Sequence, residues 1–67
     1  MRLEQIMKWT IDVWDTVDLV FISIDGLDTL PETEALARDI SAQRTTTCNV
    51  KQNGSLISSW QNGTVID

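Results

Sequence analysis

Two Asn-Gly pairs in the C-terminal third constrain the fold of this chain more than any other feature. They occupy positions 53–54 and 62–63, and each lies between short strand-like runs of apolar and polar residues. Asn-Gly is a preferred centre for a two-residue type I′ turn, because both central residues of that turn need positive φ. The two pairs therefore predict three consecutive antiparallel strands joined by tight hairpins.

The register of these three strands follows from the turns. With two-residue loops, Val50 pairs with Ile57 and Trp60 pairs with Val65. Each face then carries apolar side chains: Cys48, Val50, Ile57 and Ile66 on one, and Leu56, Trp60 and Val65 on the other. One helix covers only one face of a sheet, so we expect the second face to meet another subunit or a partner.

The N-terminal segment alternates between apolar and polar residues over positions 7–13. This period of two, rich in β-branched and aromatic residues, predicts a half-buried strand. A helix across residues 3–14 is the open alternative, because five apolar or small residues of this segment also fall at helical spacing. We favour the strand, since the helical stripe leaves out Trp9, Ile11 and Val13.

A second strand is predicted at residues 17–24, after a turn at Asp15 and Thr16. It is apolar on both faces around residues 19–22, which favours a central, covered position in the sheet or an interface between subunits. The pair Asp25-Gly26 is typical of a strand end.

The best-defined element is a helix at about residues 30–43. Thr29 fits the N-cap, Pro31 the first turn and Glu32 the acidic position of a capping box. The inward stripe is narrow, which is typical of a helix that packs on a sheet. It consists of Thr33, Leu36, Ala37 and Ile40.

These elements predict an α+β fold: a small antiparallel sheet in ββαβββ order with one helix packed on one face. We expect a single domain over residues 1–67, because this length permits one domain at most. A chain of this size buries only about 60% of the surface that its unfolded form exposes, so we expect a marginal core.

The composition argues against catalysis and against a bound metal or cofactor. The chain has no histidine, and Cys48 is its only cysteine, so a zinc site of the usual kind lacks ligands. Without a histidine to activate it, Cys48 is interpreted as a small buried apolar residue. Asp12, Asp15 and Asp18 are evenly spaced, but the ligand pattern of a calcium-binding EF-hand is absent. We therefore expect a non-enzymatic protein with no catalytic residue, metal or cofactor.

The acidic residues are unevenly placed. Eight of the ten lie at positions 12–39 beside a single base, and the chain carries a net charge of −5. A stretch of this kind is solvated or meets a cationic partner. Direct binding to nucleic acid is not expected, because phosphate contacts need Lys and Arg, of which there are five. The same argument disfavours an anionic membrane surface.

The sequence also lacks targeting features. No run of large apolar residues exceeds four, at positions 19–22, and the N-terminus lacks the apolar stretch of a signal peptide. We expect a cytoplasmic protein with a reduced thiol and no membrane contact.

Two functional hypotheses follow. The first is a small acidic protein-binding module, which by charge mimicry occupies a basic, nucleic-acid-binding surface of a larger partner in the style of phage- or plasmid-encoded inhibitors. Exposed aromatic residues often anchor such interfaces. The predicted partner-binding residues are Trp14, Asp15, Asp18, Asp25, Asp28, Glu32 and Glu34. The alternative is a self-associating structural or regulatory module, a homodimer through the sheet, whose acidic stretch only maintains solubility.

Overall fold

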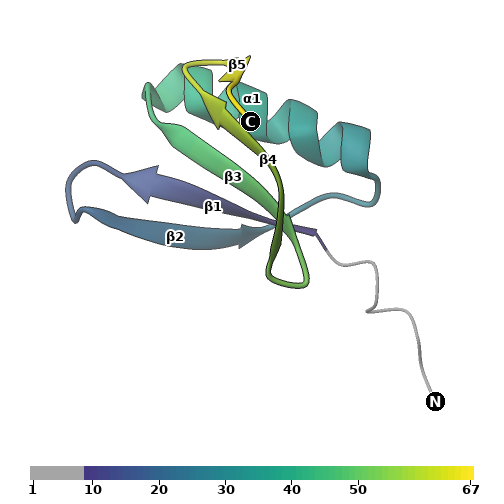
Figure 1. The fold of residues 1–67 in the computed structure, drawn as a ribbon. Coiled ribbons are helices and arrows are strands. Elements are labelled where there is room, and N and C mark those ends of the chain that lie inside the picture. The colour runs from purple at the N-terminus through teal and green to yellow at the C-terminus, as the bar shows by residue number, and fades with distance from the viewer. Residues whose placement is uncertain (1–8) are drawn as a thin grey trace.

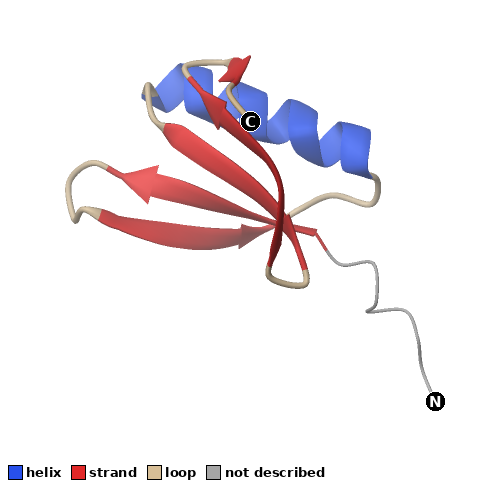
Figure 2. Ribbon diagram, in the orientation of Figure 1, coloured by secondary structure: helices blue, strands red, loops and turns tan. Residues whose placement is uncertain are grey.

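The computed structural model describes residues 9–67, which form one antiparallel sheet with one helix packed against it (Figure 1). The elements occur in the predicted ββαβββ order, and the strands lie in the order β2-β1-β3-β4-β5 (Figure 2). The predicted α+β fold class is therefore confirmed. The element bounds are β1 Trp9–Asp15, β2 Val20–Asp25, α1 Leu30–Arg44, β3 Thr47–Gln52, β4 Ser55–Gln61 and β5 Thr64–Val65.

Strand β1 forms as the alternation of its residues predicts. Ile11 and Val13 are buried, and the residues between and beside them are half-buried. The helical alternative is wrong from Trp9 onward, because pairing on both sides of β1 satisfies its backbone and buries one row of side chains. Positions 7 and 8 of the predicted strand lie outside the described residues.

Helix α1 has a defined cap at each end. The Thr29 hydroxyl oxygen accepts from the Glu32 N–H at 3.3 Å, and the same hydroxyl donates to Glu32 Oε1 at 2.9 Å. The Glu32 carboxylate thus contacts the capping hydroxyl and not the N-cap N–H of a standard capping box. Thr45 closes the helix in the left-handed region with φ of 52°, and its N–H donates to the Ser41 carbonyl. The helix extends one residue beyond its predicted end.

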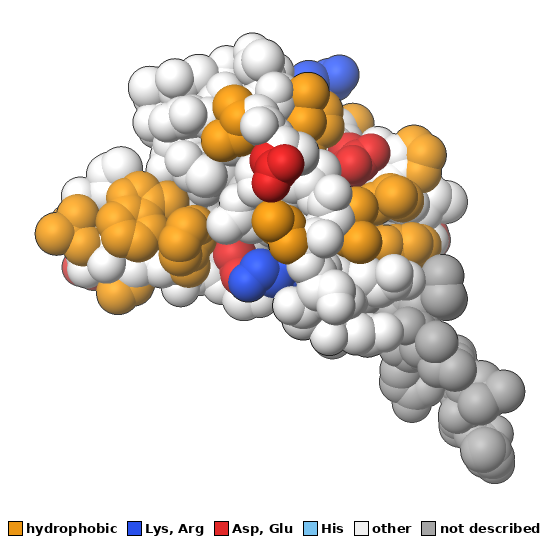
Figure 3. Space-filling view, viewed as in Figure 1, with side chains coloured by type: hydrophobic (Ala, Val, Ile, Leu, Met, Phe, Trp, Pro, Cys, Tyr) orange, Lys and Arg blue, Asp and Glu red, His pale blue; other side chains and the backbone are white. Residues whose placement is uncertain are grey.

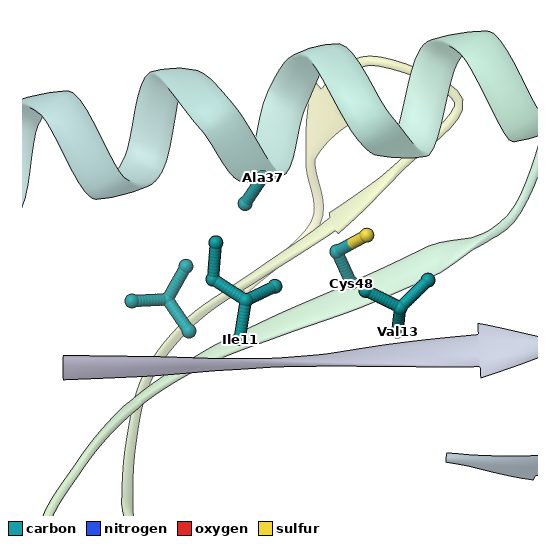
Figure 4. Packing of buried hydrophobic residues seen from close by; sticks show 5 residues of the cluster. Ile11, Val13, Ala37 and Cys48 are labelled. Atoms are coloured by element: carbon teal, nitrogen blue, oxygen red, sulfur yellow. The ribbon is translucent and has the colours of Figure 1, made fainter. Parts of the chain in front are cut away.

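The core lies between α1 and the central strands β1 and β3. Among residues 9–67, its buried apolar side chains are small or branched: Ile11, Val13, Ala37, Cys48 and Val50. Ala37 points from the helix toward Ile11, and Cys48 lies beside Val13 (Figure 4). Thr33 and Ser41 complete the buried row of the helix. The Thr33 hydroxyl donates to the carbonyl of the N-cap Thr29 at 2.8 Å, and the Ser41 hydroxyl donates to the Arg38 carbonyl at 2.9 Å. Small side chains thus let α1 approach the sheet closely.

The C-terminal turns are correct, but part of the predicted register is wrong. Asn53 and Asn62 have φ of 52° and 54°, as type I′ turns require, and both are followed by glycines with positive φ. A β-bulge in β4 then shifts the pairing: Lys51 lies opposite Leu56, but Val50 lies opposite Ser58 and not the predicted Ile57, which is the extra residue. One extra residue in a strand moves the following side chains to the opposite face.

The bulge changes which apolar side chains share a face. Trp60 pairs with Cys48 and Val65 pairs with Trp60, so all three lie on the helix-covered face, whereas Leu56 pairs with Lys51 on the open face. The predicted split between the two faces is therefore wrong. The centre of the open face is polar: Lys51 Nζ lies 3.0 Å from Asp12 Oδ2, and the Ser59 hydroxyl donates to Asn49 Oδ1 at 2.8 Å. The expected cover of this face by another subunit or a partner stays a prediction.

Strand β2 lies at an edge of the sheet, so the predicted central position is wrong. It begins at Val20, three residues after its predicted start, because residues 16–19 form the turn that joins it to β1. It ends at Asp25, one residue beyond its predicted end. Helix α1 packs over β3, β1 and β4, and Figure 1 shows β2 on the side of the sheet away from the helix. Within residues 9–67, no helix has the length and apolar character needed to cross a lipid bilayer.

Candidate protein-interaction surface

Large apolar side chains are exposed along β2 and at the tip of the β1–β2 hairpin. Val17 and Leu19 in the turn are 85% and 65% exposed, and Val20, Phe21 and Ile22 in β2 are 49%, 48% and 45% exposed. Figure 3 shows apolar side chains gathered over this end of the hairpin. Exposed apolar side chains gathered at one edge of a small protein are typical of an interaction site.

Trp14 completes this surface from the neighbouring strand. It is half-buried and lies opposite Phe21 in the β1–β2 ladder. The two rings meet edge to face, with centroids 4.9 Å apart and an interplanar angle of 65°. Trp14 and the five residues above are called the edge surface from here on, because they occupy the outer strand and the end of its hairpin.

The turn at the hairpin tip is held by Asp15 and contains an unfavourable backbone conformation. Asp15 Oδ1 accepts from the Val17 N–H at 2.8 Å and from the Asp18 N–H at 3.2 Å. Leu19 has φ of 59°, a region that residues with a Cβ rarely occupy. A leucine that is both exposed and left-handed contributes neither core packing nor favourable turn geometry. Backbone strain of this kind occurs often at functional sites.

The hydrogen bonds of β1 determine which backbone groups of β2 reach solvent. The Gly26 N–H donates to the Trp9 carbonyl at 2.8 Å, whereas the Trp14 carbonyl points to the other side of β1, where a threonine hydroxyl bonds it at 2.7 Å. Hydrogen-bonded and non-hydrogen-bonded pairs alternate along an antiparallel ladder. Phe21 and Ser23 therefore direct their backbone N–H and C=O groups away from β1, toward the outer edge of the sheet.

The predicted acidic residues are divided between the two ends of β2. Asp15 and Asp18 lie at the hairpin tip, whereas Asp25 and Asp28 lie at the far end of the strand and in the loop that follows. A strand of this length spans about 17 Å at 3.4 Å per residue. That distance is about two Debye lengths at physiological ionic strength, so each pair acts as a separate local field. The acids bracket the apolar strand and do not form one patch.

The remaining predicted site residues have other surroundings. Glu32 is exposed in the first turn of α1 and contacts the capping hydroxyl. Glu34 is half-buried on the same helix, which packs over the other strands. The structure thus brings Trp14, Asp15 and Asp18 together at the hairpin tip and leaves the two glutamates on the helix.

Five residues of the edge surface were absent from the predicted site. The signal that points to them is the run at positions 19–22, apolar on both faces and bracketed by aspartates. Over residues 9–67 one helix covers the sheet, which is too little cover for such a strand to be buried on both sides. The residues concerned are Val17, Leu19, Val20, Phe21 and Ile22.

Two observations concern the cysteine and the possible metal ligands of the described residues. Cys48 is a free thiol in the core, where burial raises its pKa and the nearby Arg44 charge partly lowers it. A raised pKa keeps this thiol protonated and unreactive at neutral pH. Over residues 9–67, no three His, Cys, Asp or Glu side chains cluster in a way that could hold a metal ion.

Comparisons with known proteins add no relative to these observations. The chain matches no protein family model, no curated protein and no solved structure.

Proposed function

We propose that this chain is a non-enzymatic protein-binding module that holds a partner with a basic surface against its edge surface. The observation that carries the proposal is an exposed apolar strand with aspartates at both ends. Burial of apolar surface contributes a favourable free energy to association, part of which offsets the freedom lost on binding. The two acidic fields supply orientation and a faster encounter with cationic residues.

The strained turn supports the same function. Leu19 keeps an apolar side chain exposed at a position where glycine would relieve the backbone. The half-buried Trp14, held by the Phe21 ring, supplies a rigid aromatic group of the type common at interaction hot spots. The polar centre of the open face, with its Asp12–Lys51 ion pair, is a less favourable docking area.

In this proposal, the aspartates of this chain take the place of nucleic-acid phosphates on the basic surface of the partner. A basic segment that contacts nucleic acid elsewhere would be occupied by this chain instead, so binding would compete with nucleic acid. The two separated acidic fields suit a partner whose basic residues flank an apolar segment. They suit a continuous phosphate-binding groove less well, because the middle of the surface is apolar.

The test is a capture experiment with charge-matched variants. The protein is immobilised, lysate is passed over it at low salt, and retained proteins are eluted in a salt gradient and identified. The strand-end variant is Asp18→Asn with Asp28→Asn, chosen because Asp15 holds the turn and Glu32 the helix cap. The control is Asp39→Asn with Asp67→Asn, which changes net charge equally at positions outside the edge surface.

The proposal predicts a basic protein that elutes at moderate salt from the unmodified chain and from the control. The strand-end variant should release it at clearly lower salt, and added duplex nucleic acid should compete for it. Equal retention by all three proteins would contradict the role of the acids at the ends of β2.

A further inference from the structure

We infer that the partner binds by adding an extended strand to the outer edge of β2, and that this added strand is apolar in its centre and carries Lys or Arg at both ends. This inference rests on the proposed function and specifies how the partner is held. An exposed sheet edge that pairs with an extended segment gains affinity from main-chain hydrogen bonds and specificity from alternate side chains.

The backbone of β2 is arranged for such pairing. Phe21 and Ser23 direct N–H and C=O groups outward, as the Gly26–Trp9 hydrogen bond and the alternation of the ladder require. Natural edge strands are usually blunted by proline, lysine, a bulge or a covering element. From Val20 to Ile24 this strand has no proline, no lysine and no register shift in its pairing with β1.

The side chains of β2 indicate which types of residue the added strand should carry on each of its faces. Val20, Ile22 and Ile24 pair with residues of the helix-covered face, so an apolar residue of the partner beside them extends a row that continues into the core. Phe21 and Ser23 lie on the open face. An aromatic residue of the partner fits beside Phe21, and a polar residue fits beside Ser23. Alternation of apolar and polar residues in the partner strand follows from these two rows.

The acids at the ends of β2 decide between a foreign strand and a second copy of this chain. If two copies paired antiparallel around Ile22, Asp18 of each copy would lie beside the Asp25–Asp28 end of the other, at both ends of the pairing. Like charges in such positions are destabilising. Basic residues at the ends of a foreign strand meet an acidic field at either end, and in either strand direction. The charges therefore oppose self-pairing and favour a basic-ended strand.

The first test uses the full chain and a short synthetic peptide with alternating valine and threonine in its centre and lysines at both ends. Two control peptides carry glutamates in place of the lysines, or N-methyl groups on the backbone nitrogens of one edge. Affinity for the unmodified chain is measured at low and moderate salt. The lysine-ended peptide should bind at least about tenfold more tightly than either control. Equal affinity for the N-methylated peptide would exclude strand addition.

The second test removes one outward donor from β2. Ser23→Pro deletes the outward N–H while the inner ladder of β1 and β2 keeps its bonds, since proline is tolerated on edge strands. Ser23→Ala is the matched control, because it keeps that donor. The proline variant should bind the lysine-ended peptide about tenfold more weakly than the alanine variant, with both folds checked by thermal unfolding. If the proline variant does not fold, the N-methylated peptide decides the question on the unmodified chain.

The outcomes separate this inference from the proposed function. Capture of a basic protein that depends on Asp18 and Asp28, together with equal binding of N-methylated and ordinary peptides, keeps the function and overturns strand addition. Loss of the capture itself overturns the function. A stable dimer of the unmodified chain at low salt, observed by sedimentation equilibrium, would overturn the choice of a foreign strand over a second copy.

Discussion

The Trp14 ring meets the Phe21 ring edge to face across β1 and β2, with centroids 4.9 Å apart. The two residues form a non-hydrogen-bonded pair, in which side chains lie closer than in hydrogen-bonded pairs. Phe21 therefore stabilises the hairpin and also fixes the orientation of the tryptophan on the edge surface. Loss of this ring contact should therefore weaken both the stability of β2 and the proposed binding.

Replacement of Phe21 tests this joint role. Phe21→Ala should lower the free energy of unfolding by about 1 kcal/mol, because an aromatic pair contributes about 0.5–1.5 kcal/mol beyond its buried area. The same variant should lose most of its affinity for the captured partner. The control Val17→Ala, at an 85% exposed position, should change stability by less than about 0.5 kcal/mol. Urea denaturation measures the stability of each variant, and equal stability of the two would contradict the structural role of the ring pair.

Leu19 provides a case in which stability and binding move in opposite directions. Leu19→Gly should raise the free energy of unfolding by about 0.5–1 kcal/mol, because relief of a left-handed Cβ outweighs the added freedom of the unfolded chain. It should also weaken partner binding, since an exposed apolar side chain is removed from the tip. Thermal unfolding and the capture assay on the same sample test both effects. A glycine variant that is less stable than the unmodified chain would contradict the strain at this position.

The two hairpin glycines should respond differently to alanine. Both have positive φ, 87° at Gly54 and 84° at Gly63, so alanine costs about 1–2 kcal/mol at each through backbone strain. A Cβ at Gly54 meets open space, whereas one at Gly63 lies 3.0 Å from the Ala42 Cβ on the helix. Gly63→Ala should therefore be clearly more destabilising than Gly54→Ala in urea denaturation. Equal losses would mean that the turn after β4 does not pack closely on α1.

The buried thiol of Cys48 should make the free energy of unfolding depend on pH in the alkaline range. Burial raises the pKa of its thiol above the usual 9.0, so the folded thiol stays protonated where the unfolded thiol ionises. The contribution of this group to stability is complete below the unfolded pKa and is lost as pH rises from there through the folded pKa. The unfolding free energy should fall above about pH 9 more steeply for the unmodified chain than for Cys48→Ala. Parallel pH profiles for the two proteins would contradict this role.

Local sequence signals predicted much of this fold, because the features concerned depend on neighbouring residues. Thr29 and Glu32 define the helix start, and the Asn-Gly pairs define both hairpins. The alternation through Ile11 and Val13 defines β1. Each of these depends on contacts within a few residues, which the order of the amino acids records directly.

The errors arise where distant parts of the chain decide the outcome. No glycine marks the bulge at Ile57, yet this bulge moves Trp60 and Val65 to the helix-covered face. A strand that is apolar on both faces suits a covered centre or an exposed edge, and only the sheet order places β2 at the edge. The acidic site residues were predicted as one stretch, whereas the strand between Asp18 and Asp25 separates them into two groups.

Amide hydrogen exchange along β2 shows whether the outer edge of this strand is open. In the free chain, we predict slow exchange at Ile22 and Ile24, which bond to β1, and fast exchange at Phe21 and Ser23, which face outward. On addition of the lysine-ended peptide, exchange at Phe21 and Ser23 should slow to the level of their neighbours. Protection of these two amides in the free chain, or unchanged fast exchange in the peptide complex, would contradict an open edge that accepts a strand.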